Sequence, residues 1–153
     1  MLYESNEKEV SLENEVNYVI NYIELEKLRQ GSAFKINFDV EGSSSGQKIA
    51  PLMFIPFLEN SFKHGLDNQI KRGFVNIKMR LNEASVELDI ENSKPPTLPT
   101  NLKPKKSGGI GLENVKRRLN LLYPGRHDLN IIDRPNSYKV LLNIQFTLSL
   151  IHI

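Results

Sequence analysis

The sequence contains no cysteine, no long apolar run and no strong excess of charge of either sign. Without cysteine the chain has no disulfide and no thiolate chemistry, which fits a reducing compartment. No apolar stretch approaches the ~20 residues that a membrane-spanning helix needs. Glu4, Glu7, Lys8 and Glu9 interrupt the start, so we expect no signal peptide. A net charge of +2 is too small to indicate binding to nucleic acid or to a membrane surface.

The composition and the hydrophobic periodicity are those of a single globular domain that mixes helices and strands. With 153 residues, of which 39% are hydrophobic, the chain is long enough for a sizeable core. Apolar residues recur at helical spacing in residues 11–29, 51–65 and 112–122, and alternate as in strands in residues 34–40, 74–81, 85–92, 129–133 and 138–148. This order predicts an α+β fold, a two-layer α/β sandwich in which about three helices cover one face of a mixed sheet. The polar residues of the other sheet face are expected to meet solvent.

The first predicted helix has signals at both of its ends. Ser11 is suited to cap its start, and Gly31 is suited to end it. Its broad apolar stripe is expected to pack on the sheet of the same domain, although part of it could instead face a second copy of the chain. Residues 1–10 are expected to be loosely held, and residues 41–46 are expected to form a flexible turn.

The second predicted helix carries polar residues beside its apolar stripe. Asn60, Lys63 and His64 are three and four residues apart, which places them on one face of a helix. An amide oxygen suits Mg²⁺ and a cation suits phosphate, so this face suits a polyphosphate with its metal. Pro56 lacks the N–H that a helix interior needs, so the regular helix is expected to start or bend there. Gly65 is expected to end the helix.

A second phosphate-binding element follows later in the chain. Residues 107–115 form a glycine-rich stretch that runs into the third helix, and the N-terminus of a helix offers backbone N–H groups to anions. Residues 93–106 contain four prolines and little to bury, so they are expected to form an extended, mobile loop. A long loop of this kind often serves as a lid.

Two motifs resemble those of the ATP-binding catalytic domain of sensor histidine kinases, in the superfamily that includes gyrase B, the Hsp-ninety chaperones and MutL. Residues 56–65, PFLENSFKHG, resemble the N box, and residues 109–119, GIGLENVKRRL, resemble the second glycine box. The sequences of these two motifs most resemble those of the LytS/YehU branch. Residues 21–29 are similar to the segment that follows the phosphoacceptor region in that branch. The resemblance covers residues 10–148 and implies the Bergerat-type ATP-binding fold.

The resemblance implies a role for each matching residue. Asn60 would bind the Mg²⁺ that bridges the phosphates of ATP, Lys63 would contact phosphate, and His64 would lie against the nucleotide. Glu59, directly before the metal ligand, would orient a water or the metal, which makes Glu59, Asn60 and Lys63 the candidate catalytic residues. Residues 93–108 would form the ATP lid. The glycine box would bind ATP through Gly109, Ile110, Gly111 and Leu112.

The chain also departs from the family pattern in two places. Many members end the second hairpin strand with Asp-x-Gly-x-Gly, whose Asp receives the adenine amino group; here Asn92 replaces the Asp and both glycines are missing. An Asn oxygen can still accept that hydrogen bond, so adenine selectivity is expected to persist with weaker affinity. The phosphoacceptor histidine is missing too, because His64, His127 and His152 lie in no motif like PHFxxN. The chain alone is therefore not expected to autophosphorylate.

The resemblance further implies what surrounds this chain in its full-length protein. It would be the cytoplasmic catalytic part of an inner-membrane sensor of a two-component system, homodimeric in full length. Residues 1–30 would hold the end of the dimerisation or linker region and the first helix, and residues 31–153 the ATP-binding catalytic domain. The phosphate would pass from ATP to a phosphoacceptor histidine on another segment, and then to a response regulator, expected to be of the LytTR type. Nucleic acid has no part in this scheme.

Each candidate residue also has a plainer interpretation. Asn60 could be a surface or capping amide, and Asn92 could be a residue that ends a strand. His64 could cap the C-terminus of its helix, and the glycines could form only a tight turn. Arg117 and Arg118 are expected on a solvated helix face, from which one could reach phosphate or a partner.

Two rival functions are compatible with the same motifs. A degenerate nucleotide-binding module, which binds a partner and transfers nothing, is motivated by Asn92 and by the glycine-poor entry to the lid. A free-standing ATPase or serine kinase of the same superfamily is the other rival. The hydrolytic relatives place a water-activating Glu four residues before the metal-binding Asn, where this chain has Pro56, which argues against that rival.

Overall fold

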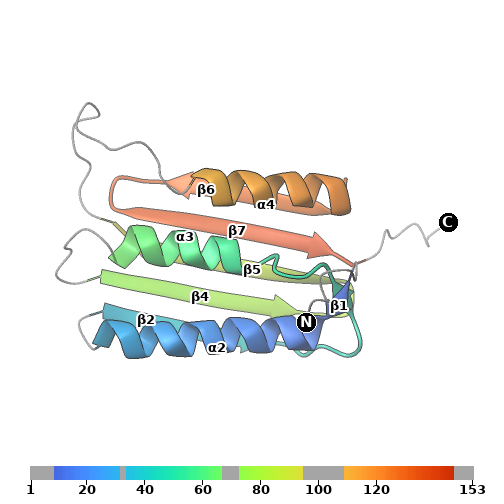
Figure 1. Ribbon diagram of the computed structural model, residues 1–153, viewed down its shortest axis with the longest axis horizontal. Coiled ribbons are helices and arrows are strands. Elements are labelled where there is room, and N and C mark those ends of the chain that lie inside the picture. Colours follow the sequence, from blue (N-terminus) through green and yellow to red (C-terminus); the bar gives the residue numbers. More distant parts are fainter. Residues whose placement is uncertain (1–8, 32–33, 67–72, 95–108, 147–153) are drawn as a thin grey trace.

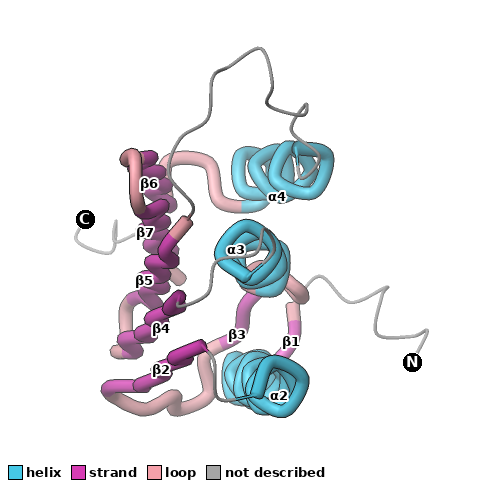
Figure 2. Tube along the Cα trace, turned by 90° about the vertical axis from the view of Figure 1, so that its left-hand side faces the viewer, coloured by secondary structure: helices cyan, strands magenta, loops and turns pink. Residues whose placement is uncertain are grey.

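Three helices cover one face of a five-stranded sheet in the computed structural model, which describes residues 9–31, 34–66, 73–94 and 109–146 (Figures 1 and 2). The elements are, in chain order, β1 (Val10–Ser11), α2 (Leu12–Gln30), β2 (Phe34–Glu41), β3 (Lys48–Ile49), α3 (Ile55–Leu66), β4 (Gly73–Leu81), β5 (Ser85–Ser93), α4 (Gly109–Leu122), β6 (His127–Asp133) and β7 (Ser137–Gln145). The predicted α+β sandwich with a mixed sheet is confirmed.

The sheet has the strand order β2-β4-β5-β7-β6. Strands β2 and β4 are parallel and flank the crossover through α3, whereas the other neighbours are antiparallel. The predicted hairpin of β4 and β5 turns at Asn82, whose Oδ1 accepts hydrogen bonds from the backbone N–H groups of Ala84 and Ser85 at 2.8 and 2.9 Å. A separate small pair, β1 with β3, was not predicted, because strands of two residues are too short to show any periodicity.

Helix α2 forms because its capping signals and its apolar stripe agree. The Oγ of Ser11 accepts a hydrogen bond from the backbone N–H of Asn14 at 3.1 Å, and Gly31 ends the helix at a positive φ of 72°. Its sheet-facing side buries Leu12, Val16, Val19 and Ile23, as expected for a stripe that packs on the sheet. On the opposite side lie three exposed apolar residues, Tyr18, Leu25 and Leu28.

Helix α3 begins at a point that places its proline in the first turn. It starts at Ile55, so Pro56 stands in the first turn, where a backbone N–H has no acceptor within the helix. The carbonyl of Phe54 accepts the hydrogen bonds of the next free N–H groups, those of Phe57 at 3.0 Å and Leu58 at 3.2 Å. The expected start near Pro56 is confirmed, and the helix ends at Leu66, one residue beyond Gly65.

The segment before α3 is held from two sides. Leu52 has a φ of +54°, a left-handed conformation that few residues other than glycine adopt. Its N–H donates to Oε1 of Glu15 on α2 at 3.0 Å, and Arg118 on α4 donates to the carbonyls of Leu52 at 3.3 Å and Pro51 at 2.8 Å. Arg118, expected on a solvated face, therefore ties α4 to the start of α3.

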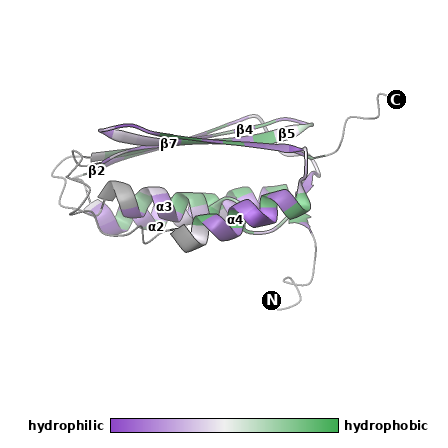
Figure 3. Cartoon of the chain, turned by 90° about the horizontal axis from the view of Figure 1, so that it is seen from above, coloured by the Kyte–Doolittle hydropathy of each residue, from purple (hydrophilic) through white to green (hydrophobic). Residues whose placement is uncertain are grey.

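The core lies between the two layers, which Figure 3 shows edge-on. It is built from the sheet-facing sides of all three helices and the inward residues of the sheet, and its largest fully buried side chains are Leu12, Ile23, Ile49, Met53, Phe54, Phe57, Leu58, Met79, Leu88, Ile90, Leu119 and Leu142. In the described part of the chain, no helix is both long enough and apolar enough to cross a membrane.

Candidate functional site

One end of the sandwich collects the segments that the sequence singled out. Helix α3 and strand β5 both run toward this end, where β7 and α4 begin (Figure 1). In the end-on view, α3 lies between α2 and α4 above the middle of the sheet (Figure 2). The predicted N box, the end of the hairpin and the predicted glycine box therefore meet at one place, although they are far apart in the sequence.

Asn60 is turned from α3 into the space between the layers. Its neighbours in the helix, Phe57, Leu58 and Ser61, are fully buried, and Asn60 itself is only 7% exposed. Its Nδ2 is buried and meets no hydrogen-bond partner of standard geometry among the described residues. An amide left unpaired in this way costs stability, so its position needs an explanation other than folding.

Asn92 lies on the inward side of β5 and is fully buried. Its Nδ2 donates to the carbonyl of Ser93 at 2.8 Å, which orients the amide. Its Oδ1 is then a buried acceptor without a partner in the described structure, and so is Oγ of Ser61 on α3. Within the described structure, Oγ of Ser61 and Oδ1 of Asn92 are thus buried without a partner, and Nδ2 of Asn60 lacks one of standard geometry.

Tyr138 completes this end of the inner sheet face. It stands directly opposite Asn92 in the register of β5 and β7 and is half-buried against the core. Burial raises the pKa of its hydroxyl, a side-chain hydrogen bond with Asn60 lowers it in part, and the nearby Asp133 raises it. Sequence reasoning treated Tyr138 only as an apolar strand residue. The signal it missed is a phenol hydroxyl on the inward face of the strand beside the predicted adenine contact.

The prediction that Lys63 shares one face with Asn60 is wrong, because Asn60 is buried whereas Lys63 lies with Glu59 on another side of α3. Both are exposed, and they line a groove of about 350 Å³ between α2 and α3, together with Tyr22, Glu26, Arg29, Gln30 and Phe62. The rings of two of these residues, Tyr22 and Phe62, contact each other with centroids 5.9 Å apart. The structure therefore brings Asn60 together with Asn92 and Tyr138, and places the two charged candidates in an adjoining groove.

The glycine box forms the first turn of α4, which starts at Gly109 rather than at the predicted residue 112. Gly111 is exposed, and no atom lies within 4 Å of the position a Cβ would take there, so a ligand can approach the backbone. Leu112 is half-buried against the core. The side chains of His64 and Ile110 lie outside the described residues, as does most of the predicted lid, residues 95–108.

The donor set fits a magnesium ion carried in with a polyphosphate. Within the described residues no group of three or more His, Cys, Asp or Glu side chains could hold a metal ion by itself. Magnesium commonly takes only one or two protein ligands and completes its shell with phosphate oxygens and waters. Asn60, one amide at the edge of the space between the layers, matches that requirement.

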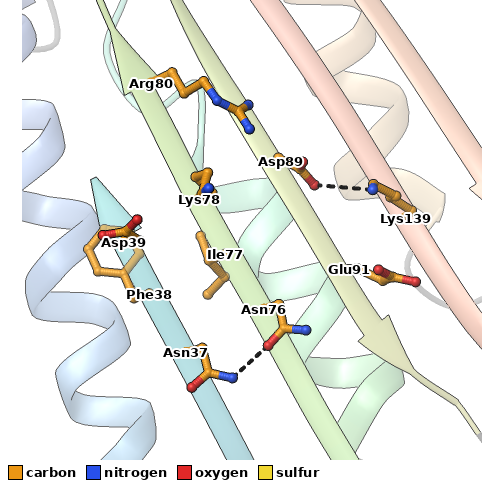
Figure 4. A pocket seen from close by; sticks show the side chains of 10 residues that line it. All are labelled: Asn37, Phe38, Asp39, Asn76, Ile77, Lys78, Arg80, Asp89, Glu91 and Lys139. Carbon is orange, nitrogen blue, oxygen red and sulfur yellow. Dashed lines mark hydrogen bonds and ion pairs between the residues drawn. The ribbon is translucent and has the colours of Figure 1, made fainter. Parts of the chain in front are cut away.

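A second hollow lies on the outer face of the sheet and is of a different kind (Figure 4). Its volume is about 370 Å³, and charged residues on the strands dominate its lining. There the amide of Asn37 donates to Oδ1 of Asn76 at 2.7 Å, and Lys139 pairs with Asp89 at 3.8 Å. This hollow lies on the face away from the helices and shares no residue with the cluster around Asn60.

Solved structures of histidine kinases share the fold. A nucleotide-free catalytic domain of the histidine kinase ThkA matches with a TM-score of 0.65 at 17% identity, over 92% of this chain and 97% of that one. ThkA in complex with the response regulator protein TrrA matches with a TM-score of 0.58 at 19% identity, over 91% of this chain and 41% of that one. At these identities the likeness shows the fold alone.

Curated relatives are similar in sequence as well. The sensor histidine kinase BtsS of Escherichia coli K12 is 26% identical over 129 residues, 84% of this chain and 22% of BtsS. The sensor protein LytS of Enterococcus faecalis is 24% identical over 122 residues, 74% of this chain and 21% of LytS. The chain thus spans about a fifth of the length of these relatives. No family model matches it. The resemblance to LytS-type sensor histidine kinases that the two motifs indicated is confirmed.

Proposed function

We propose that this chain, which has sensor histidine kinases as its homologues and the fold of their catalytic domains, binds ATP and transfers its γ-phosphate to a histidine that lies outside the chain. The observation that carries the proposal is a pair of buried polar atoms without a partner in the described structure, Oγ of Ser61 and Oδ1 of Asn92, beside Asn60, whose Nδ2 has no partner of standard geometry there. All three residues lie at the end of the sandwich where α4 begins. A bound nucleotide would supply partners for the atoms of Ser61 and Asn92 that the fold leaves without one.

Asn92 would recognise the base. Its amide nitrogen is engaged with the carbonyl of Ser93, so its oxygen is presented as an acceptor in a buried place. The amino group of adenine is a donor that this oxygen can accept, whereas guanine presents an oxygen at the same position and would meet repulsion. A neutral amide forms a weaker hydrogen bond than a carboxylate, so affinity should be lower than with an Asp there.

Asn60 and the start of α4 would hold the triphosphate. The first N–H groups of α4 lack acceptors within the helix and favour anionic oxygens, and the exposed backbone at Gly111 gives access to them. The amide oxygen of Asn60 would hold Mg²⁺, which when bound offsets the negative charge of the phosphates. His64 is proposed to lie against the nucleotide, Gly109 and Ile110 to bind ATP as part of the glycine box, and residues 93–108 to form the ATP lid.

Glu59 and Lys63 are proposed to act at the edge where the acceptor arrives. Both project into the groove between α2 and α3, next to the buried side of Asn60 on the same helix. The ammonium group of Lys63 can extend from this edge to a phosphate oxygen, because its stem has four rotatable carbons. The carboxylate of Glu59 can orient a water or receive a proton beside it.

The partners follow from the missing acceptor. The phosphoacceptor histidine would lie on another segment of a homodimeric sensor, with residues 1–30 near the dimerisation region and residues 31–153 as the catalytic domain on the cytoplasmic side of an inner membrane. ThkA has been solved with a response regulator, and we propose a response regulator, of the LytTR type, as the final phosphate acceptor here.

The proposed site is tested by the affinity for Mg-ATP of two variants, each of which replaces one asparagine. Asn60→Ala is expected to weaken binding of Mg-ATP at least about tenfold in calorimetry, since it removes a charge-assisted contact. Asn130→Ala, at an exposed position of β6, is the matched control and should leave binding unchanged. Equal affinity of the Asn60→Ala variant and the unmodified chain would contradict the proposed site.

The transfer test supplies the missing substrate. A separate fragment that carries a PHFxxN-like motif is incubated with the chain and labelled Mg-ATP, and acid-labile phosphate on the fragment is expected. Binding of ATP without any transfer to fragments of related sensors would instead support a degenerate module that only binds nucleotide.

A further inference from the structure

Three polar side chains from three elements meet at the inner face of the sheet, and one of them has no part in the site as proposed so far. Asn60 comes from α3, Asn92 from β5 and Tyr138 from β7. We infer that Tyr138 is a positioning residue, which holds the amide of Asn60 so that its oxygen faces the metal and phosphates. The inference rests on the proposed function and assigns a residue to the metal end of that site.

The register places Tyr138 where its ring can reach α3. Tyr138 pairs with Asn92, and the next inward pair along the same two strands is Val140 with Ile90, both fully buried. The ring therefore continues the apolar inner face of the sheet, and a side-chain hydrogen bond links its hydroxyl to Asn60. Tyr138, which stands opposite the proposed base contact Asn92, thus contacts the proposed metal ligand Asn60.

The hydroxyl of Tyr138 needs an explanation other than packing, because a phenylalanine ring would pack at this position equally well. Burying a hydroxyl costs free energy unless it is hydrogen-bonded. The groups that face it are Asn60 from α3 and the carboxylate of Asp133 from β6, and burial raises the pKa of the phenol, so it is protonated at neutral pH and can donate as well as accept.

The contact with Asn60 controls which end of the amide is presented. An amide has an oxygen on one side and an N–H₂ group on the other, and only the oxygen can bind a cation. Nδ2 of Asn60 meets no partner at standard geometry, so its approach to Tyr138 is loose in this conformation. A metal on the oxygen side would hold the amide in place, and the phenol oxygen would then receive the N–H₂ side more closely.

The inference predicts an effect on metal-dependent binding that a merely structural role would not produce. Affinity for ATP is measured by calorimetry with Mg²⁺ and with EDTA, for the unmodified chain, Tyr138→Phe and the control Tyr18→Phe on the exposed side of α2. Tyr138→Phe is expected to weaken Mg-ATP binding about 3- to 10-fold, the value of one hydrogen bond. It should leave binding of ATP in EDTA unchanged, and Tyr18→Phe should change neither.

A double variant separates positioning of Asn60 from a direct contact with nucleotide. In Asn60→Ala with Tyr138→Phe, loss of the hydroxyl should cost nothing further, because its partner is already gone. If Tyr138→Phe loses equal affinity for ATP with and without Mg²⁺, Tyr138 contacts the base and the inference is overturned. Unchanged affinity of this variant for Mg-ATP would also overturn it. These results differ from failure of the proposed function, in which the unmodified chain binds no ATP. Thermal unfolding of each variant shows whether it is folded.

Discussion

The two faces of the sheet differ in whether their polar groups are paired. On the outer face, Asp39, Lys78 and Asp89 form one row across three strands, and Glu41, Arg80 and Glu87 form the next. Arg80 pairs with Glu87 at 2.6 Å and with Glu41 at 3.6 Å, and Lys78 pairs with Glu41 at 3.4 Å. Charge there is matched within the face itself, in contact with solvent.

On the inner face, by contrast, polar groups are few, buried and concentrated at one end. Asn92 on this face and Ser61 on α3, which packs over it, are fully shielded from solvent, and each keeps a polar atom without a partner in the described structure. Exposed ion pairs contribute little to stability, whereas an unsatisfied buried group costs about 1–3 kcal/mol. The outer face is therefore complete without a ligand, whereas the inner end is not.

The largest effect on stability is expected from removing an unpaired group. Ser61→Ala deletes a buried hydroxyl that has no partner and places a better helix former in α3, so the free energy of unfolding should rise by about 1 kcal/mol. Chemical denaturation measures this change. Ser85→Ala, at a half-exposed strand end, is the control and should be neutral.

The same variant shows whether the inner end is incomplete for a functional reason. If the hydroxyl serves a bound nucleotide, Ser61→Ala gains stability and loses affinity for Mg-ATP. A loss of stability would mean that the hydroxyl is satisfied in the folded chain, and the contrast between the two faces would fail at this residue.

A smaller effect is expected from Glu15, which is buried but paired. Burial raises its pKa, the hydrogen bond from the N–H of Leu52 lowers it in part, and so does Arg118. Because the folded pKa lies above the unfolded value, the contribution of this group is fully present below about pH 4.5 and is lost as pH rises through the folded pKa.

Glu15→Gln tests that sign while keeping an oxygen for the N–H of Leu52. The variant should be modestly more stable than the unmodified chain at pH 7, and the difference should shrink as pH falls toward 4.5. Denaturation curves across this range measure it. A variant less stable at pH 7 than at pH 4.5, relative to the unmodified chain, would show that the attraction to Arg118 outweighs burial.

The smallest effect is expected on the outer face. Arg80→Ala removes two exposed ion pairs of the ladder, and the resulting loss of stability should be slight at low salt and absent at 1 M salt, because solvent and ions already screen these charges. Denaturation at the two salt concentrations measures it. A large, salt-independent loss would mean that the outer face is held by more than surface pairing.

Much of the fold could be predicted because its signals are local. The caps of α2 at Ser11 and Gly31, the start of α3 near Pro56 and the alternation of β4 and β5 all depend on residues within one element or directly beside it. The pairing of β1 with β3 could not be predicted, since it joins residues about 38 positions apart through strands too short to show a pattern.

The local sequence is enough to predict the three helices and the strands of the five-stranded sheet, and it places the N box and the glycine box along the chain. How α3 is turned depends on the assembled fold, in which Asn60 is buried toward Tyr138 while Glu59 and Lys63 line the groove against α2. In the assembled fold, Arg118 also holds the backbone before α3. The reason is physical: periodicity specifies which face of an element is buried, but neighbours across that face depend on the register and packing of all the elements together.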